Sequence, residues 1–168
     1  DTMLEEYERP LSEELIKNYH RILKNGTSDS RLDWFKVGDY KALPNEVGGK
    51  ETIAPKKVSS EIKKLFSWYS AKEEVKFDDV LEFHYRFESI HPFQDGNGRV
   101  GRALMFKECL KHNIIPFIIE DEYKGLYYRG LSEYLNEKGY LRDTCLAMQD
   151  KYELLIKRFL GDFLDGNI

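Results

Sequence analysis

The chain has 168 residues, of which 41% are hydrophobic and 33% are charged, and its formal net charge is −4. This size and composition predict a single globular domain and exclude an intrinsically disordered or membrane-embedded chain. Acidic and basic residues are interspersed along the sequence, without the basic stripe that is typical of nucleic-acid-binding proteins. We therefore expect neither nucleic acid nor a membrane as a partner.

The hydrophobic periodicity predicts a mainly α-helical chain. In chain order, helices are expected from Ser12 to about Gly26, over residues 56–71, from after Asp78 to His91, and over about 97–112, 122–137 and 142–164. Ser12 is a typical N-cap residue, and Pro92 disfavours helical backbone at His91, so the third helix should end there. The side chains expected to face the core from the last two helices are Leu126, Leu131, Leu135, Cys145, Met148, Tyr152, Leu155 and Phe159.

Residues 37–55 interrupt the helical pattern with prolines and glycines. Gly48-Gly49, with Asn45 nearby, predicts the tip of a β-hairpin or a long flap, and a plain surface loop is the alternative. Cys109 and Cys145 lie far apart and match no metal-ligand spacing, so we expect buried thiols and a cytoplasmic location. Because the first residue is Asp1 rather than Met, the sequence leaves room for a missing upstream segment.

The segment from His91 to Arg102 reads HPFQDGNGRVGR and combines an imidazole, a carboxylate, a glycine-rich turn and two guanidinium groups. Its turn runs into a predicted helix start, where backbone N–H groups attract phosphate. Arg99 and Arg102 lie three residues apart and therefore project from one helix face. Two guanidinium groups beside such a turn suit the β- and γ-phosphates of a nucleotide.

Two other residues of this segment have candidate roles. Asp95 either caps the amides of the turn or holds Mg²⁺, which binds proteins through one or two carboxylates together with substrate phosphates. A neutral imidazole at His91 is suited to take the proton from an attacking hydroxyl. Phe93 is expected to anchor the loop, whereas His20, His84 and His112 are expected to be structural.

Two competing motifs fit less well. The glycines at 96, 98 and 101 match the dinucleotide-binding pattern, but that pattern must follow a buried strand, and residues 79–90 have helical periodicity. A calcium-binding loop requires a Glu at its twelfth position, where this chain has Phe106.

Residues 91–102 resemble the signature of the Fic (Fic/Doc) family, H-x-F-x-[DE]-G-N-G-R-x-x-R, at every specified position. The similarity extends over about residues 11–160. It implies one Fic domain over residues 1–168, a Fic-type helical bundle with a small β-hairpin flap, and a protein adenylyltransferase. Such an enzyme transfers AMP from Mg²⁺-bound ATP to a Tyr, Ser or Thr hydroxyl of a target protein.

The resemblance also implies roles for individual residues. His91 would be the general base and Asp95 the metal ligand, and the target protein would dock on the flap at about residues 39–54 as an added strand. The residues implied to hold ATP are Gly96, Asn97, Gly98, Arg99 and Arg102 at the phosphates, with Tyr127 or Tyr128 at the adenine. Related kinases carry Lys at the position of Gly98, and a related phosphocholine transferase carries Ala at that of Gly96, so nucleotidyl transfer is favoured.

One family feature does not match. Many relatives contain an inhibitory helix with the pattern [ST]-x-x-x-E-[GN], but residues 2–6 are followed by Tyr7 and residues 70–74 by Val75. Inhibition would then reside in an upstream segment or a partner protein, or be absent. Two further functions stay open: removal of AMP from modified proteins at the same site, and nucleotide binding without catalysis.

Overall fold

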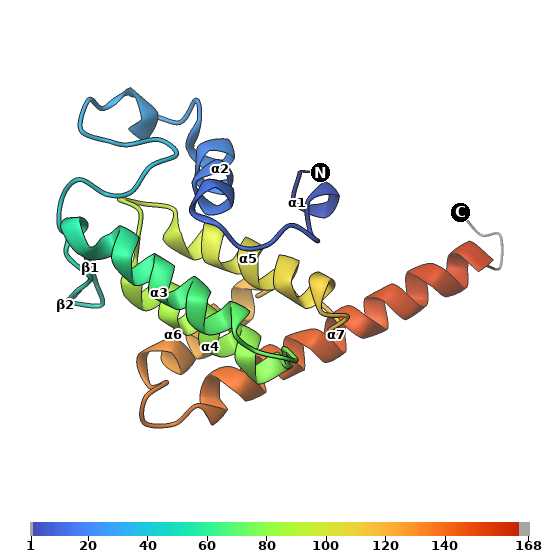
Figure 1. Cartoon of the computed structure of the whole chain (residues 1–168). Helices are drawn as coiled ribbons and strands as arrows, with labels where there is room; N and C mark the ends of the chain where they lie inside the picture. Colours follow the sequence, from blue (N-terminus) through green and yellow to red (C-terminus); the bar gives the residue numbers. More distant parts are fainter. Residues whose placement is uncertain (1, 165–168) are drawn as a thin grey trace. The chain divides into compact units, whose positions relative to one another are not determined.

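A computed structural model of the chain describes residues 2–164 (Figure 1). In chain order, the elements are α1 (Thr2–Glu5), α2 (Glu13–Lys24), the 3-10 helix η1 (Asp29–Arg31), β1 (Glu46–Val47), β2 (Lys50–Glu51), η2 (Pro55–Lys57), α3 (Val58–Ser70), α4 (Phe77–Ile90), α5 (Asn97–Lys111), η3 (Asp121–Tyr123), α6 (Lys124–Ser132) and α7 (Gly139–Leu164). The chain is mainly α-helical with a two-stranded antiparallel sheet, as predicted.

Contacts divide the chain into two compact units, Asp1–Met105 and Phe106–Ile168, and the division falls inside α5. A single domain over residues 1–168 stays a prediction, and residues 1 and 165–168 lie outside the described part. In the first unit, α3 and α4, drawn in green in Figure 1, pack against each other. The buried side chains of its core are Leu15, Ile16, Tyr19, Val58, Ile62, Leu65, Tyr69, Phe83, Phe87, Ile90, Phe93, Val100 and Leu104.

Helix ends in the first unit follow local capping chemistry. The Ser12 hydroxyl accepts the Leu15 N–H at 3.1 Å, which confirms the predicted N-cap of α2. The helix α4 begins at Phe77, slightly earlier than expected, because the Asp79 carboxylate accepts the Lys76 N–H at 2.9 Å. It ends at Ile90, as the following proline led us to expect. His91 itself adopts the left-handed conformation (φ 52°, ψ 62°), which the sequence did not predict.

The predicted hairpin tip is confirmed. The strands pair Glu46 with Glu51 and Val47 with Lys50, and positive φ angles at Gly48 (57°) and Gly49 (76°) turn the chain between them. Positive φ at both central residues is typical of the two-residue turns that match the twist of a hairpin. The ladder is only two residues long on each side, and most of the flap (residues 37–55) is irregular.

In the second unit, the prediction for residues 122–137 is partly wrong. The helix α6 ends at Ser132, and Leu126 and Leu135 are 51% and 81% exposed. Gly130 explains the difference, because a Cβ atom there would lie 2.6 Å from Leu141 Cα at the start of α7. This close approach turns a different face of α6 inward.

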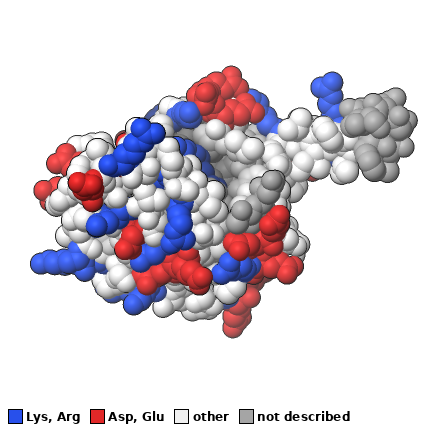
Figure 2. Space-filling model, turned by 90° about the horizontal axis from the view of Figure 1, so that it is seen from above, with Lys and Arg blue, Asp and Glu red and all other residues white. Residues whose placement is uncertain are grey.

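The buried residues of that face and its continuation are Tyr127, Gly130 and Tyr134. On α7, Cys145 and Met148 are buried as predicted, but Leu155 and Phe159 are 57% and 64% exposed and do not face a core in the described chain. No helix in the described residues is long and apolar enough to cross a membrane. On the face shown in Figure 2, basic and acidic side chains are interspersed, in agreement with the sequence.

Candidate functional site

The signature loop, residues 91–102, connects α4 to α5 and is shaped by its own side chains. Asn97 Oδ1 accepts the Phe93 N–H at 2.7 Å, and Asn97 Nδ2 donates to the Phe93 carbonyl at 2.8 Å. Both side chains are buried, and Gly96 between them has φ 83°. The Asn97 side chain therefore closes the loop, while the first backbone N–H groups of α5 have no acceptor within their own helix.

His20 on α2 packs against the loop and donates a hydrogen bond to it. Its ring stacks on Phe93 with centroids 4.1 Å apart and planes 2° from parallel. Its Nδ1 accepts the Gly38 N–H at 2.9 Å, so its Nε2 carries the proton and donates to the Asp95 carbonyl at 3.1 Å. Burial lowers the pKa of His20 to about 4. The ring is therefore neutral at pH 7, which agrees with the structural role expected from the sequence.

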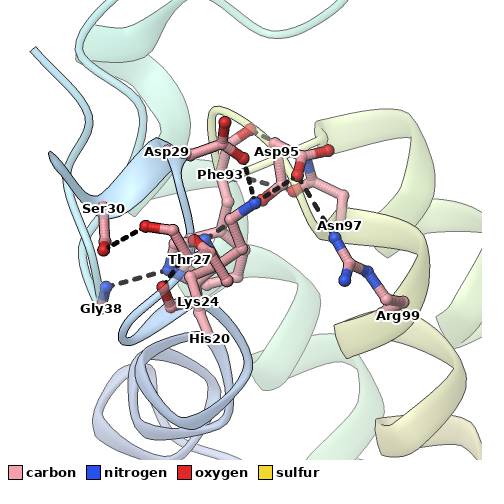
Figure 3. A network of polar contacts seen from close by, with 10 residues as sticks. All are labelled: His20, Lys24, Thr27, Asp29, Ser30, Gly38, Phe93, Asp95, Asn97 and Arg99. Atoms are coloured by element: carbon pink, nitrogen blue, oxygen red, sulfur yellow. Dashed lines mark hydrogen bonds and ion pairs between the residues drawn. The ribbon is translucent and has the colours of Figure 1, made fainter. Parts of the chain in front are cut away.

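Asp95 lies in a network of two cations and two carboxylates (Figure 3). The Lys24 ammonium, on α2, is 2.6 Å from Asp95 Oδ2 and also pairs with Asp29, and Arg99 Nη2 is 3.3 Å from the same oxygen. Burial would raise the pKa of Asp95, but the hydrogen bonds from Lys24 and from the Gly96 backbone outweigh it and lower the pKa. Asp95 is therefore ionised throughout the neutral range.

His91, at the end of α4, is held with one ring nitrogen available. Its Nδ1 is 3.3 Å from the Glu88 carbonyl, which can only accept, so Nδ1 carries the proton and Nε2 keeps its lone pair. Burial lowers the pKa of His91, and the positive charge of Lys41 lowers it further. The ring is therefore neutral at pH 7, which is the state that a general base requires.

The flap is attached to the signature loop by three hydrogen bonds. They join the Lys41 N–H to the Pro92 carbonyl (2.9 Å), the Leu43 N–H to Gln94 Oε1 (3.1 Å), and Asn45 Nδ2 to the Phe93 carbonyl (3.0 Å). The flap and the loop are thereby held together within the first unit.

Lys41 also connects two parts of the flap through its side chain. Its ammonium donates to Asn45 Oδ1 at 2.7 Å and to Thr52 Oγ1 at 2.6 Å, and its side chain is almost fully buried. Burial lowers the pKa of Lys41 to about 8. Nothing in the local sequence pattern distinguishes Lys41 from other lysines, so its place in the flap could not be predicted.

Arg102 lies near Glu88, a buried carboxyl group on α4. Glu88 Oε1 and the His84 ring pack so closely on Gly101 that no side chain would fit at this position without displacing them. Burial raises the pKa of Glu88 to about 7, although the charge of Arg102 acts to lower it. Glycine at position 101 is therefore required here by the packing of α4 against α5.

Magnesium fits the donor set around Asp95. The described residues contain no group of three or more acidic, His or Cys side chains that is placed to hold a metal. A single carboxylate beside a helix start, where backbone N–H groups attract phosphate, agrees with an ion that takes most of its other ligands from phosphates and water.

Tyr127 and Tyr128 belong to the second unit. Tyr127 is 1% exposed and Tyr128 is 55% exposed, and their ring centroids lie 5.3 Å apart. Their role at adenine stays a prediction. Of the contacts around Asp95, sequence reasoning missed Lys24 and Asp29, which are more than sixty positions away from it in the chain.

Residues 10–109 match the family model described as Fic/DOC family. The chain belongs to the Fic/DOC family. This Fic chain is 24% identical over 152 residues to "Protein adenylyltransferase fic-1" of Caenorhabditis elegans, which covers 89% of this chain and 28% of that protein. It is 28% identical over 118 residues to "Protein adenylyltransferase Fic" of Aedes aegypti, which covers 68% of this chain and 22% of that protein.

A solved structure supports the Fic fold. The crystal structure of a Fic domain containing signaling protein from Bacteroides thetaiotaomicron has a TM-score of 0.70 to this chain at 24% identity, over 88% of this chain and 61% of that one. The chain spans less than a third of the length of the two curated relatives.

Proposed function

We propose that this chain carries the nucleotidyl-transfer site of a protein adenylyltransferase, which moves AMP from ATP to a Tyr, Ser or Thr hydroxyl of a target protein. The observation that carries the proposal is His91, neutral and with Nε2 available, on a loop that is closed by Asn97 beside the ionised Asp95. The names of the curated relatives agree with this activity.

In the proposed reaction, His91 Nε2 takes the proton of the target hydroxyl. The hydroxyl oxygen forms a bond to the α-phosphorus of ATP, the bond from that phosphorus to the bridging oxygen breaks, and pyrophosphate leaves. Gly96, Asn97 and Gly98 would contribute backbone N–H groups, and Arg99 and Arg102 would pair with the β- and γ-phosphates. Fixed donors of this kind stabilise the charge that develops during transfer.

Asp95 would hold the Mg²⁺ that accompanies ATP, and this ion would supply charge neutralisation at the phosphates. Tyr127 or Tyr128 would line the adenine pocket. The target would add an extended segment to the flap over about residues 39–54, where the strands β1 and β2 are exposed. Buried free thiols at Cys109 and Cys145 support a cytoplasmic location. An inhibitory segment or partner stays a prediction.

ATP labelled at either the α- or the γ-phosphate tests the proposal. With Mg²⁺ and a cell extract, we expect protein to retain label only from the α-phosphate. His91→Ala should still bind ATP but lower transfer at least about 100-fold, the lower end of what a general base contributes.

Other results would contradict the proposal in distinct ways. Label from the γ-phosphate would indicate a kinase, and absence of label would favour AMP removal or nucleotide binding alone. Equal labelling by wild type and His91→Ala would remove the role of His91 as base.

A further inference from the structure

Asp95 already has a cation at its carboxylate in this structure. The Lys24 ammonium lies 2.6 Å from Asp95 Oδ2, and its side chain is only 3% exposed. The aliphatic part of Lys24 packs on the turn itself: a Cβ atom added at Gly96 would lie only 3.6 Å from Lys24 Cδ. Lys24 is therefore packed against the loop, with almost no surface exposed to solvent.

Asp29, at the start of η1, holds the same ammonium from the other side and pairs with it directly. The aromatic face of Phe35 covers it, with Nζ 5.1 Å from the ring centroid. Since two carboxylates and one ring surround the ammonium, the contact with Asp95 is a built feature of the fold and not a chance surface ion pair.

The charges of this network cancel. Lys24 and Arg99 are positive, Asp29 and Asp95 are negative, and His20 beneath them is neutral. A divalent cation that arrives alone therefore meets no net negative charge, and two positive groups, Lys24 and Arg99, already lie at the carboxylate that would hold it. A cation that arrives with a triphosphate brings compensating negative charge of its own.

We propose that Lys24, held by Asp29, is the built-in counter-ion of Asp95 and keeps uncomplexed divalent cations off the signature loop, so that the metal binds only together with a polyphosphate. The inference rests on the proposed function in one respect, the use of Asp95 as metal ligand. It adds a role for two residues outside the signature, which act through Asp95 and are not catalytic themselves.

Binding of free Mn²⁺ without nucleotide tests this, measured from the paramagnetic resonance signal of the unbound ion. Lys24→Met keeps the buried aliphatic chain and removes the charge. We expect it to bind free Mn²⁺ about tenfold or more tightly than wild type, the order expected when one unit charge is removed a few Å from the ion. Lys24→Gln should show the same increase in Mn²⁺ affinity, and it is the variant to measure if Lys24→Met does not fold.

Two controls locate the effect. Lys17→Met removes another α2 lysine that pairs with an aspartate, Asp39 at 2.7 Å, and should bind Mn²⁺ like wild type. Lys24→Met combined with Asp95→Asn should lose the gained affinity, since the ion would bind at Asp95.

Free Mn²⁺ binding by Lys24→Met within about twofold of that by Lys17→Met would overturn the proposal. So would a gain that survives Asp95→Asn. Transfer of the α-label by wild type is scored separately, so a failure of the counter-ion proposal is distinct from a failure of the proposed enzymatic function.

Discussion

Glu88, on α4 beside the signature loop, is a buried carboxyl group whose charge should make the stability of the fold depend on pH. Its Oε1 is buried without a hydrogen-bond partner among the described residues, and it packs against Gly101. Burial raises its pKa from 4.5 to about 7. Because the folded state binds this proton more tightly than the unfolded state, the contribution of Glu88 to stability is complete below pH 4.5 and is lost as the pH rises through 7.

The free energy of unfolding of Glu88→Gln, relative to that of wild type, should therefore rise by about 2 kcal/mol from pH 5 to pH 8. Urea unfolding at the two pH values measures the difference. Glu61→Gln, which changes a carboxylate paired with the exposed Lys64, is the matched control and should show no such trend. A difference between Glu88→Gln and wild type that is independent of pH would show that the carboxyl does not ionise in this range.

The flap is the element whose position depends most on single polar contacts. Asn45 links three parts of it, because its amide donates to the Phe93 carbonyl of the signature loop and its Oδ1 accepts from Lys41 and Thr52. The two-residue strands add few hydrogen bonds of their own. The hairpin end of the flap therefore depends largely on this side chain for its attachment, while Lys41 and Leu43 hold the start of the flap through their backbone N–H groups.

Asn45→Ala should lower the free energy of unfolding by about 1–3 kcal/mol, the usual cost of leaving buried polar partners unpaired. Amide hydrogen exchange over residues 46–51 should become faster, while ATP binding stays unchanged. Asn18→Ala, at an exposed position that pairs only with Arg21, is the control. Unchanged exchange over the flap would mean that other contacts hold it.

For individual helices, the sequence predicts the ends well where a local signal marks them. Ser12 and Pro92 set the boundaries of α2 and α4 as expected. The inward face of α6 was missed, since it depends on the close approach of Gly130 to Leu141 and not on the positions of its leucines. The same limit applies to α7, whose later apolar residues are exposed.

For the whole molecule, nucleotide binding should appear as increased stability. A ligand that binds only the folded state at about 100 times its dissociation constant adds about 2.7 kcal/mol. We expect Mg²⁺ and ATP together to raise the melting temperature of the full chain, and Mg²⁺ alone to leave it unchanged. Thermal unfolding with each addition measures this, and an equal shift with Mg²⁺ alone would contradict the charge balance around Asp95.

The site as a whole was predictable only in part. Residues 91–102 are contiguous, so their chemistry could be inferred from the sequence. Lys24 reaches Asp95 from a position 71 residues away, and the Lys41 ammonium lies 3.5 Å from the carbonyl of Ile90, 49 residues away. Such long-range pairs leave no periodic pattern in a single sequence, so only the fold reveals them.

The double hydrogen bond between Asn97 and Phe93 has a kinetic consequence. A turn that is already closed by its own side chain has little backbone ordering cost left to meet when a nucleotide arrives. Capture should then be governed by diffusion and electrostatic attraction, with association fast and weakly dependent on temperature. Asn97→Ala would convert the segment into one that must first rearrange, and its association rate in stopped-flow measurements should fall more than its dissociation rate rises.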